Sequence, residues 1–223
     1  GLPLQGAAGA GSAPSPFTST CLPNYKANTD VLAIRRFSTA VTTGGLAANQ
    51  VYAQAHWDAI KFDLGSNAST FTFKKKDNVT ASDIREYLVR VYFISTCSKC
   101  SGGSADTIPT LYRAEMKAGQ WSFVPIAEGI ENLQLRYGLD EDANGLPDDT
   151  GLTVNPATVQ NWANVLTVEV NLLARNTEAS TGYTDNKQYV LGDVTVTAPG
   201  DGFRRRAFST TVSAVNPASL REQ

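Results

Sequence analysis

The chain has 223 residues, of which 42% are hydrophobic and 18% are charged, and its formal net charge at pH 7 is −2. This length is enough for one large or two small domains whose core needs no metal or disulfide. Nucleic-acid-binding proteins usually carry an excess of basic residues, so we do not expect nucleic acid as the main partner. No apolar run approaches the roughly 18 residues that a membrane helix requires.

The first part of the chain predicts a lead-in followed by short strands. Residues 1–20 are rich in Gly, Ala, Ser and Pro, which is typical of a flexible or extended segment. We expect the remaining residues, 21–223, to form a single globular head. Its first strands are predicted at residues 29–37, 60–64 and 70–73, where apolar residues alternate or β-branched residues gather.

The middle of the chain predicts a central strand and two hairpins. Residues 87–94 are aromatic and β-branched, which favours a central strand. We expect the chain to return along residues 109–116 and to turn again at residues 118–120. Pro125 is then predicted to end the next strand, because proline cannot donate a hydrogen bond to a strand ladder.

The last third of the chain predicts two strands around an acidic loop and then a final pair. Apolar residues alternate over residues 128–138 and 164–173, the period of half-buried strands. Residues 189–197 and 204–215 are expected to pair with each other. Many short strands with little helix predict a β-rich α+β fold with mostly antiparallel sheets.

The acidic loop between the strands at 128–138 and 164–173 is the strongest chemical signal in the sequence. Its oxygen-bearing residues have the spacing of a calcium loop, and Gly145 stands at the sixth position, where the chain must turn tightly. The loop departs from an EF-hand, because Gly151 replaces the expected bidentate Glu at the twelfth position. The alternative is a solvent-exposed turn without metal, since Asp, Asn and Gly are common turn residues. The candidate Ca²⁺ ligands are Asp140, Asp142, Asn144, Leu146 through its carbonyl, Asp148 and Asp149.

The three cysteines favour a structural disulfide. Cys97 and Cys100 follow a predicted strand at a hairpin tip, so we predict that they pair and that Cys21 is the free thiol. The alternative pairs Cys21 with one of them. Zinc would need both Cys21 and His56 as further ligands. A redox motif is expected at a helix N-terminus, whereas these cysteines follow a predicted strand.

His56 is the only histidine, and no nucleophile elbow or phosphate loop is present, so we expect no enzymatic activity.

Two basic runs have simple structural interpretations. The run at residues 74–76 is predicted to be a solvated turn, because short charge runs usually face water. The run at residues 204–206 is predicted to protect an edge strand with charge, and a contact with a partner subunit is the alternative. Trp121 and Trp162 are expected to anchor the core.

Three segments resemble the PilW family of minor type IV pilins. They are IAEGIENLQLRYGLDEDANGLPDD (126–149), WANVLTVEVNLLARN (162–176) and RRRAFSTTVSAVN (204–216). The resemblance extends more weakly to TDVLAIRR (29–36), YFISTCSKC (92–100) and PTLYRAEM (109–116). The resemblance implies a type IV pilin-like head, with the N-terminal hydrophobic stalk helix absent from this chain.

The same resemblance implies a function in assembly. Such a minor pilin is a non-enzymatic subunit that primes pilus assembly or lies at the pilus tip, where it contacts other minor pilins and a tip adhesin. It implies an inner-membrane protein with a periplasmic head before assembly and a location in the extracellular pilus afterwards, with membrane contact only through the absent helix. The alternatives are a J-type minor pseudopilin of type II secretion and a calcium-stabilised surface-binding module.

Overall fold

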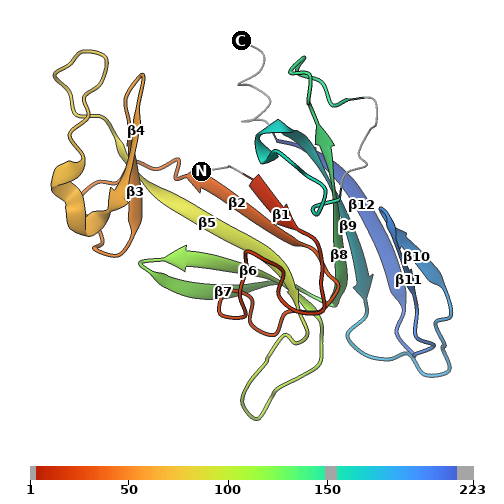
Figure 1. The fold of residues 1–223 in the computed structure, drawn as a ribbon. Helices are drawn as coiled ribbons and strands as arrows, with labels where there is room; N and C mark the ends of the chain where they lie inside the picture. Colours follow the sequence, from red (N-terminus) through yellow and green to blue (C-terminus); the bar gives the residue numbers. More distant parts are fainter. Residues whose placement is uncertain (1–3, 149–154, 215–223) are drawn as a thin grey trace.

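The strands in the described part of the chain form two antiparallel sheets and a separate hairpin (Figure 1). The computed structural model describes residues 4–148 and 155–214. Within these residues the helical elements are two short 3-10 segments, η1 (Gly65–Thr70) and η2 (Trp162–Asn164), and no helix has the length and hydropathy to cross a membrane. The predicted β-rich, mostly antiparallel architecture is confirmed, but the described residues lack the helices that the α part of the prediction requires.

Strand β5 (Ile84–Ser95) is the centre of the larger, seven-stranded sheet. One edge of β5 pairs with β2 (Val31–Phe37), and β2 pairs with β1 (Leu4–Ala7). The other edge is shared, because β3 (Val51–Ala55) pairs with the beginning of β5 and β6 (Thr110–Lys117) pairs with its second half. The prediction of a central strand is therefore confirmed.

Two hairpins extend this sheet, and one of them corrects a prediction. Strand β3 continues into β4 (Ile60–Leu64), and β6 continues into β7 (Gln120–Glu128). Pro125 does not end β7, contrary to the prediction, but pairs with Tyr112 beside a bulge. Among the described residues β7 pairs only with β6, so the N–H that proline lacks is not needed on the outer edge.

The strand predicted at residues 70–73 is also wrong. Residues up to Thr70 belong to η1, and the next three residues are irregular. The Asp63 carboxylate accepts hydrogen bonds from Asn67 Nδ2 at 2.8 Å and Thr70 Oγ1 at 2.9 Å. Such local side-chain bonds favour a turn over an extended strand.

The smaller sheet contains β8 (Ile130–Leu139), β9 (Val165–Arg175) and β12 (Arg205–Ser213), in the order β12-β9-β8. Strands β8 and β9 are the two that were predicted around the acidic loop. Gly129 carries the chain from the larger sheet into this one with a φ of +77°, and a Cβ there would lie 2.4 Å from the Arg175 carbonyl oxygen. We call β8, β9 and β12 the C-terminal sheet.

The prediction that residues 189–197 pair with residues 204–215 is wrong. Strands β10 (Gln188–Leu191) and β11 (Val194–Thr197) form a hairpin with each other, while β12 pairs with β9. The connecting residues Gly192 and Asp193 are a common two-residue hairpin loop, and Gly192 has a φ of +61°. The turn signal was therefore present within the segment that the sequence interpretation treated as one strand.

The central strands of the larger sheet are covered on both faces. A loop formed by residues 8–30 covers one face, and the C-terminal sheet covers the other. Trp121 packs on the first side and Trp162 on the second, so both tryptophans contact the core as predicted. The first side contains Cys21, Leu22, Val31, Ala33, Val91 and Phe93, and the second contains Ile94, Leu133, Leu135, Tyr137, Val165 and Val168.

Much of the predicted lead-in belongs to the fold. Strand β1 pairs with β2, Ala7 is buried, and Phe17 packs against the core. Gly6 lies directly over the C-terminal sheet, because a Cβ at this position would be 2.1 Å from Tyr137 Oη. The small residues in this segment therefore permit close packing.

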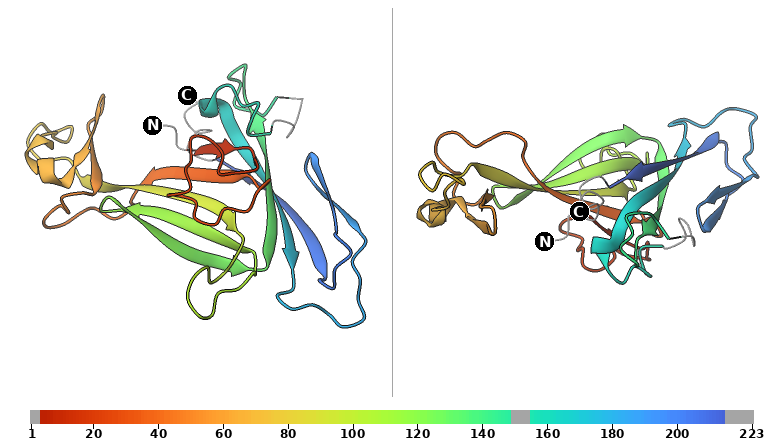
Figure 2. Two further views of the ribbon diagram at one scale, coloured as in Figure 1. Left: turned by 60° about the horizontal axis from the view of Figure 1, so that its bottom comes forward. Right: turned by 90° about the horizontal axis from the view of Figure 1, so that it is seen from above.

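One part of the chain projects from the larger sheet. Strands β3 and β4, η1 and the loop that follows form what we call the distal lobe, residues 51–83. In Figures 1 and 2 the lobe lies at the end of β5 that is remote from the C-terminal sheet. Its surface is thus separate from the surface of that sheet.

Candidate functional site

The acidic loop leaves the C-terminal sheet at the end of β8 and wraps around Asp140. The Asp140 side chain is buried, and its main-chain N–H donates to the Asn164 carbonyl at 2.9 Å. Asp140 Oδ1 accepts a hydrogen bond from the Asn144 N–H and Oδ2 accepts one from the Gly145 N–H, both at 3.1 Å. Asp140 therefore fixes the tight turn at Gly145, where φ is +84°.

Two more carboxylates approach Asp140. Asp148 Oδ2 accepts a hydrogen bond from the Glu141 N–H at 2.8 Å, and the Asp148 N–H donates to the Leu139 carbonyl at 2.8 Å, which closes the loop. One oxygen from each of Asp140, Asp142 and Asp148 lies within 4.8 Å of the others. Such a group of carboxylates can hold a metal ion, because a cation relieves their mutual repulsion.

The other predicted ligands have different positions. Asn144 Oδ1 accepts a hydrogen bond from the Leu146 N–H at 2.8 Å, and Asn144 Nδ2 donates to Asp142 Oδ2 at 2.9 Å. The Leu146 residue is 67% exposed. Asp149 lies outside the described residues. The structure thus brings three of the predicted ligands together and places Asn144 beside them.

The cysteine prediction is confirmed. Cys97 and Cys100 form a disulfide, and Cys21 is a free, buried cysteine. The loop after the disulfide closes on Asp106, whose carboxylate accepts hydrogen bonds from the Ser98 hydroxyl at 2.7 Å and from the Ser98 and Ile108 N–H groups. These hydrogen bonds lower the pKa of Asp106 to about 2, and the bond from the Ser98 hydroxyl contributes most.

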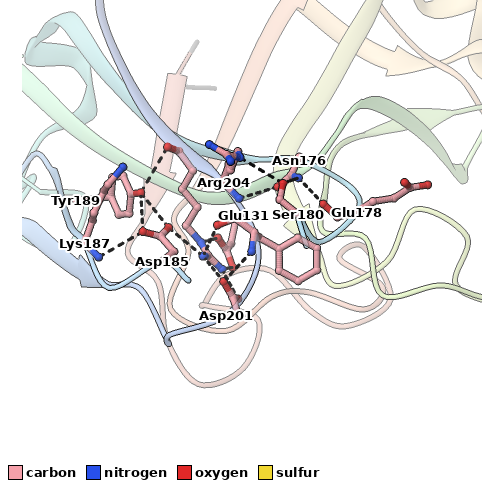
Figure 3. Close-up of polar contacts among 11 residues, drawn as sticks. Glu131, Asn176, Glu178, Ser180, Asp185, Lys187, Tyr189, Asp201 and Arg204 are labelled. Atoms are coloured by element: carbon pink, nitrogen blue, oxygen red, sulfur yellow. Dashed lines mark hydrogen bonds and ion pairs between the residues drawn. The ribbon is translucent and has the colours of Figure 1, made fainter. Parts of the chain in front are cut away.

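An ion-pair network lies at the opposite end of the C-terminal sheet, around Arg205. The Arg205 side chain is 1% exposed. Its guanidinium contacts both carboxylate oxygens of Glu131, at 2.5 and 3.2 Å, and both of Asp201, at 2.6 and 2.7 Å. It also contacts Asp185 Oδ2 at 3.2 Å. Figure 3 shows Glu131, Asp185 and Asp201 converging from three segments of the chain.

The electrostatics of this network follow from charge pairing. Hydrogen bonds to Asp201 and Glu131 raise the pKa of Arg205 above its usual value, and the bond from Arg205 lowers the pKa of Asp201. Burial alone would raise the pKa of Asp185, but the Tyr189 hydroxyl, the Lys187 N–H and Arg205 lower it overall. Burial and the Asp185 carboxylate raise the pKa of Tyr189 to about 12.

The network attaches the segment between β9 and β12 to the C-terminal sheet. Arg205 is on β12 and Glu131 is on β8, whereas Asp185 and Asp201 flank the β10–β11 hairpin. Next to it, the Arg204 N–H donates to Asn176 Oδ1 at 2.7 Å (Figure 3). Sequence reasoning missed this cluster, although the alternation of a strand places the middle arginine of the run on the opposite face from its neighbours.

Strand β12 is the outer strand of the C-terminal sheet. It pairs with β9 over its full length and with no other strand among the described residues, which agrees with the predicted edge position. Beyond Arg205 every residue of β12 is exposed, including Phe208 at 49% and Val212 at 54%. An edge of this length with apolar side chains is a surface on which another chain can pair.

Comparison with known proteins relates this arrangement to one family. A family model for type IV pilus-assembly protein W, PilW, matches residues 91–216. The match covers more than half of the chain, from the second half of β5 to the end of β12, and leaves β1 to β4 outside. No curated protein and no solved structure matches the chain. The chain therefore belongs to the PilW family of type IV pilus-assembly proteins.

Proposed function

We propose that this chain is the head of a minor type IV pilin, a structural subunit that primes pilus assembly or lies at the pilus tip. The match to PilW over β5 to β12 carries this proposal. In this role the chain acts by binding other minor pilins and a tip adhesin, not by catalysis. Its location is the cell envelope before assembly and the pilus after it.

The exposed side of β12 supports a role in subunit contact. Phe208 and Val212 lie four residues apart on one face of the strand, and both are about half exposed. The ion pairs of Arg205 hold the beginning of β12 in place, so this surface is presented on a rigid strand. A neighbouring subunit that adds a strand to this edge would pair its main chain and cover both apolar side chains.

Site-specific photo-cross-linking tests the proposal. A photoreactive amino acid is placed at Phe208 in the natural protein, produced in its own cells, and cross-linked products are identified by mass spectrometry. Val79 is the matched control, because it is 76% exposed and apolar but lies in the distal lobe outside the family match. We expect pilin subunits to be linked to position 208 and not to position 79.

Two other outcomes would contradict the proposal. Cross-links from position 208 to components of a type II secretion system would favour a J-type minor pseudopilin. Labelling of both positions to the same low extent, with no identified pilin, would show that β12 is not a subunit contact.

We also propose that the acidic loop binds Ca²⁺. Ca²⁺ binds six to eight oxygen ligands, and the loop offers Asp140, Asp142 and Asp148 together with the side-chain oxygen of Asn144 and the Leu146 carbonyl. Water would complete the set. Calcium bound here would stabilise the connection between β8 and β9, and Asp149 is a further candidate ligand.

Calorimetric titration with millimolar calcium tests this second proposal. Asp142→Asn and Asp148→Asn are expected to weaken binding, because each removes a negative charge while preserving the size of the side chain. Asp77→Asn is the control, since Asp77 closes an exposed turn by accepting the Val79 and Thr80 N–H groups at 2.9 Å. Absence of heat with the unaltered protein, or an equal effect of the control, would contradict calcium binding.

A further inference from the structure

The tip of the β3–β4 hairpin presents an aromatic side chain that the turn itself does not require. The chain turns at residues 56–59, where the His56 N–H donates to the Ala59 carbonyl at 2.7 Å, and the central residues are Trp57 and Asp58. Turns of this kind favour Gly, Asn and Asp for their backbone conformation. Trp57 is 76% exposed, so it contributes little to the core. Its ring is therefore available for contact with a ligand.

The tip is held in one arrangement by its neighbours. His56 Nδ1 lies 2.7 Å from Asp58 Oδ1, and the His56 ring centroid is 5.5 Å from that of Trp57 and 5.9 Å from that of Phe73. The aromatic surface is therefore positioned before a ligand arrives, which lowers the entropy cost of binding.

A pocket of about 310 Å³ lies beside Trp57. Its apolar lining includes Phe37, Ala53 and Ala55, and the residues of the 74–76 run and Arg85 contribute the charges. This volume is at the lower end of the roughly 300–1,000 Å³ typical of small-ligand sites. It is suited to one or two rings of a ligand.

The charge of the pocket is positive. Four cationic residues and one carboxylate, that of Asp83, line it. Asp83 is already paired with Lys75 at 3.1 Å and with Arg85 at 3.3 Å. Lys74 and Lys76 are exposed and form no ion pair with any residue in the described ranges. Two ammonium groups are thus available to an anionic ligand, although the chain as a whole is slightly acidic.

We propose that this pocket binds an acidic saccharide, such as a uronic acid unit of a polysaccharide. The C–H face of the sugar ring would pack on Trp57, and Lys74 and Lys76 would pair with its carboxylates. The proposal goes beyond the role of the C-terminal sheet, because the pocket is lined by the distal lobe together with Phe37 and Arg85, all of which lie outside the family match.

Single-stranded nucleic acid fits this pocket less well. Proteins that bind single strands combine a basic groove that follows several phosphates with aromatic residues on which successive bases stack. Trp57 is 76% exposed, whereas Phe37, the other exposed aromatic residue of the lining, is 36% exposed and its ring packs against those of Phe62 and Tyr87. The lining also contains a single short basic run. One charged ring is therefore the ligand that the pocket favours.

Calorimetry with the full chain and a galacturonic acid oligosaccharide tests the proposal, with the corresponding neutral galactose oligosaccharide as the comparison. Trp57→Ala should weaken binding of the acidic sugar about tenfold or more, and Trp57→Phe should restore most of the affinity. The double variant Lys74→Ser/Lys76→Ser should weaken binding several-fold and reduce its dependence on salt. Lys75 is left unchanged because it pairs with Asp83.

The control double variant is Lys99→Ser/Lys117→Ser, which removes the same charge from exposed positions outside the distal lobe and should leave affinity unchanged. Equal binding of the neutral sugar, or an equal loss in the control, would overturn the proposal. So would binding of inorganic phosphate as tight as that of the acidic sugar. Binding of an oligothymidylate without binding of the acidic sugar would overturn it in favour of nucleic acid.

Discussion

Replacing Arg205 with methionine is expected to lower the free energy of unfolding by about 3–5 kcal/mol, the usual cost of removing one partner from a buried ion pair. The reason is that Asp185, whose side chain is 0% exposed, would remain buried without a counterion. The side chains of Glu131 and Asp201 are 18% and 28% exposed, so water can solvate them in part and their contribution is smaller. A loss of this size is a large fraction of the roughly 5–15 kcal/mol that stabilises a typical domain.

Urea unfolding monitored by tryptophan fluorescence measures this loss, and the control is Arg204→Met. Arg204 lies next to Arg205 but is exposed, and its guanidinium stacks at 4.4 Å over the Tyr183 ring. Its replacement should cost no more than about 1 kcal/mol. Arg205→Lys should be intermediate, because one ammonium group cannot form two bidentate pairs.

Hydrogen exchange locates the effect of Arg205→Met. The N–H groups of Asn176 and Asp185, which donate to the carbonyls of Arg204 and Asp201, should exchange faster in this variant than in the unaltered chain. The reasoning is refuted if Arg205→Met costs less than about 1 kcal/mol or no more than the Arg204 variant.

Three further predictions concern the core and its ionisable groups. Tyr137→Phe should raise the free energy of unfolding measured with urea by about 1 kcal/mol, because the Tyr137 hydroxyl is buried without a partner among the described residues. A loss of stability would contradict this. Gly6→Ala should cost about 1–3 kcal/mol in the same assay, because its Cβ would meet that hydroxyl, and the cost should shrink in the Tyr137→Phe background. Burial raises the pKa of Asp30 to about 6, so the folded state takes up a proton above the unfolded pKa of 3.8 and stability is lost as the pH rises to 6. Between pH 4 and pH 7 the chain should lose about 2 kcal/mol relative to Asp30→Asn, and parallel curves for the two proteins would refute this.

Much of the fold could be predicted from local patterns. The alternation around Leu133 and Leu135 gave the correct buried face of β8, and the aromatic run that includes Phe93 identified the central strand. These predictions succeed because strand periodicity and burial are properties of neighbouring residues. The pairing of β12 with β9 could not be predicted in the same way, because partner choice depends on segments far apart in the sequence.

The candidate site shows the same division. The spacing of Asp140, Asp142 and Asp148 lies within one loop, and the structure brings their oxygens together. The Arg205 network involves segments more than 70 residues apart, since it joins Arg205 to Glu131. No local pattern marks Glu131 as the partner of an arginine on another strand, so tertiary structure was needed to find it.

Quantitative mass spectrometry of fibres sheared from the cell surface tests the role of this chain in the pilus most directly. A minor pilin should be present in these fibres, in smaller amounts than the major subunit, and deleting its gene should reduce the number of fibres. A protein that remains entirely in the membrane fraction, with normal fibre numbers after deletion, would contradict the proposed function.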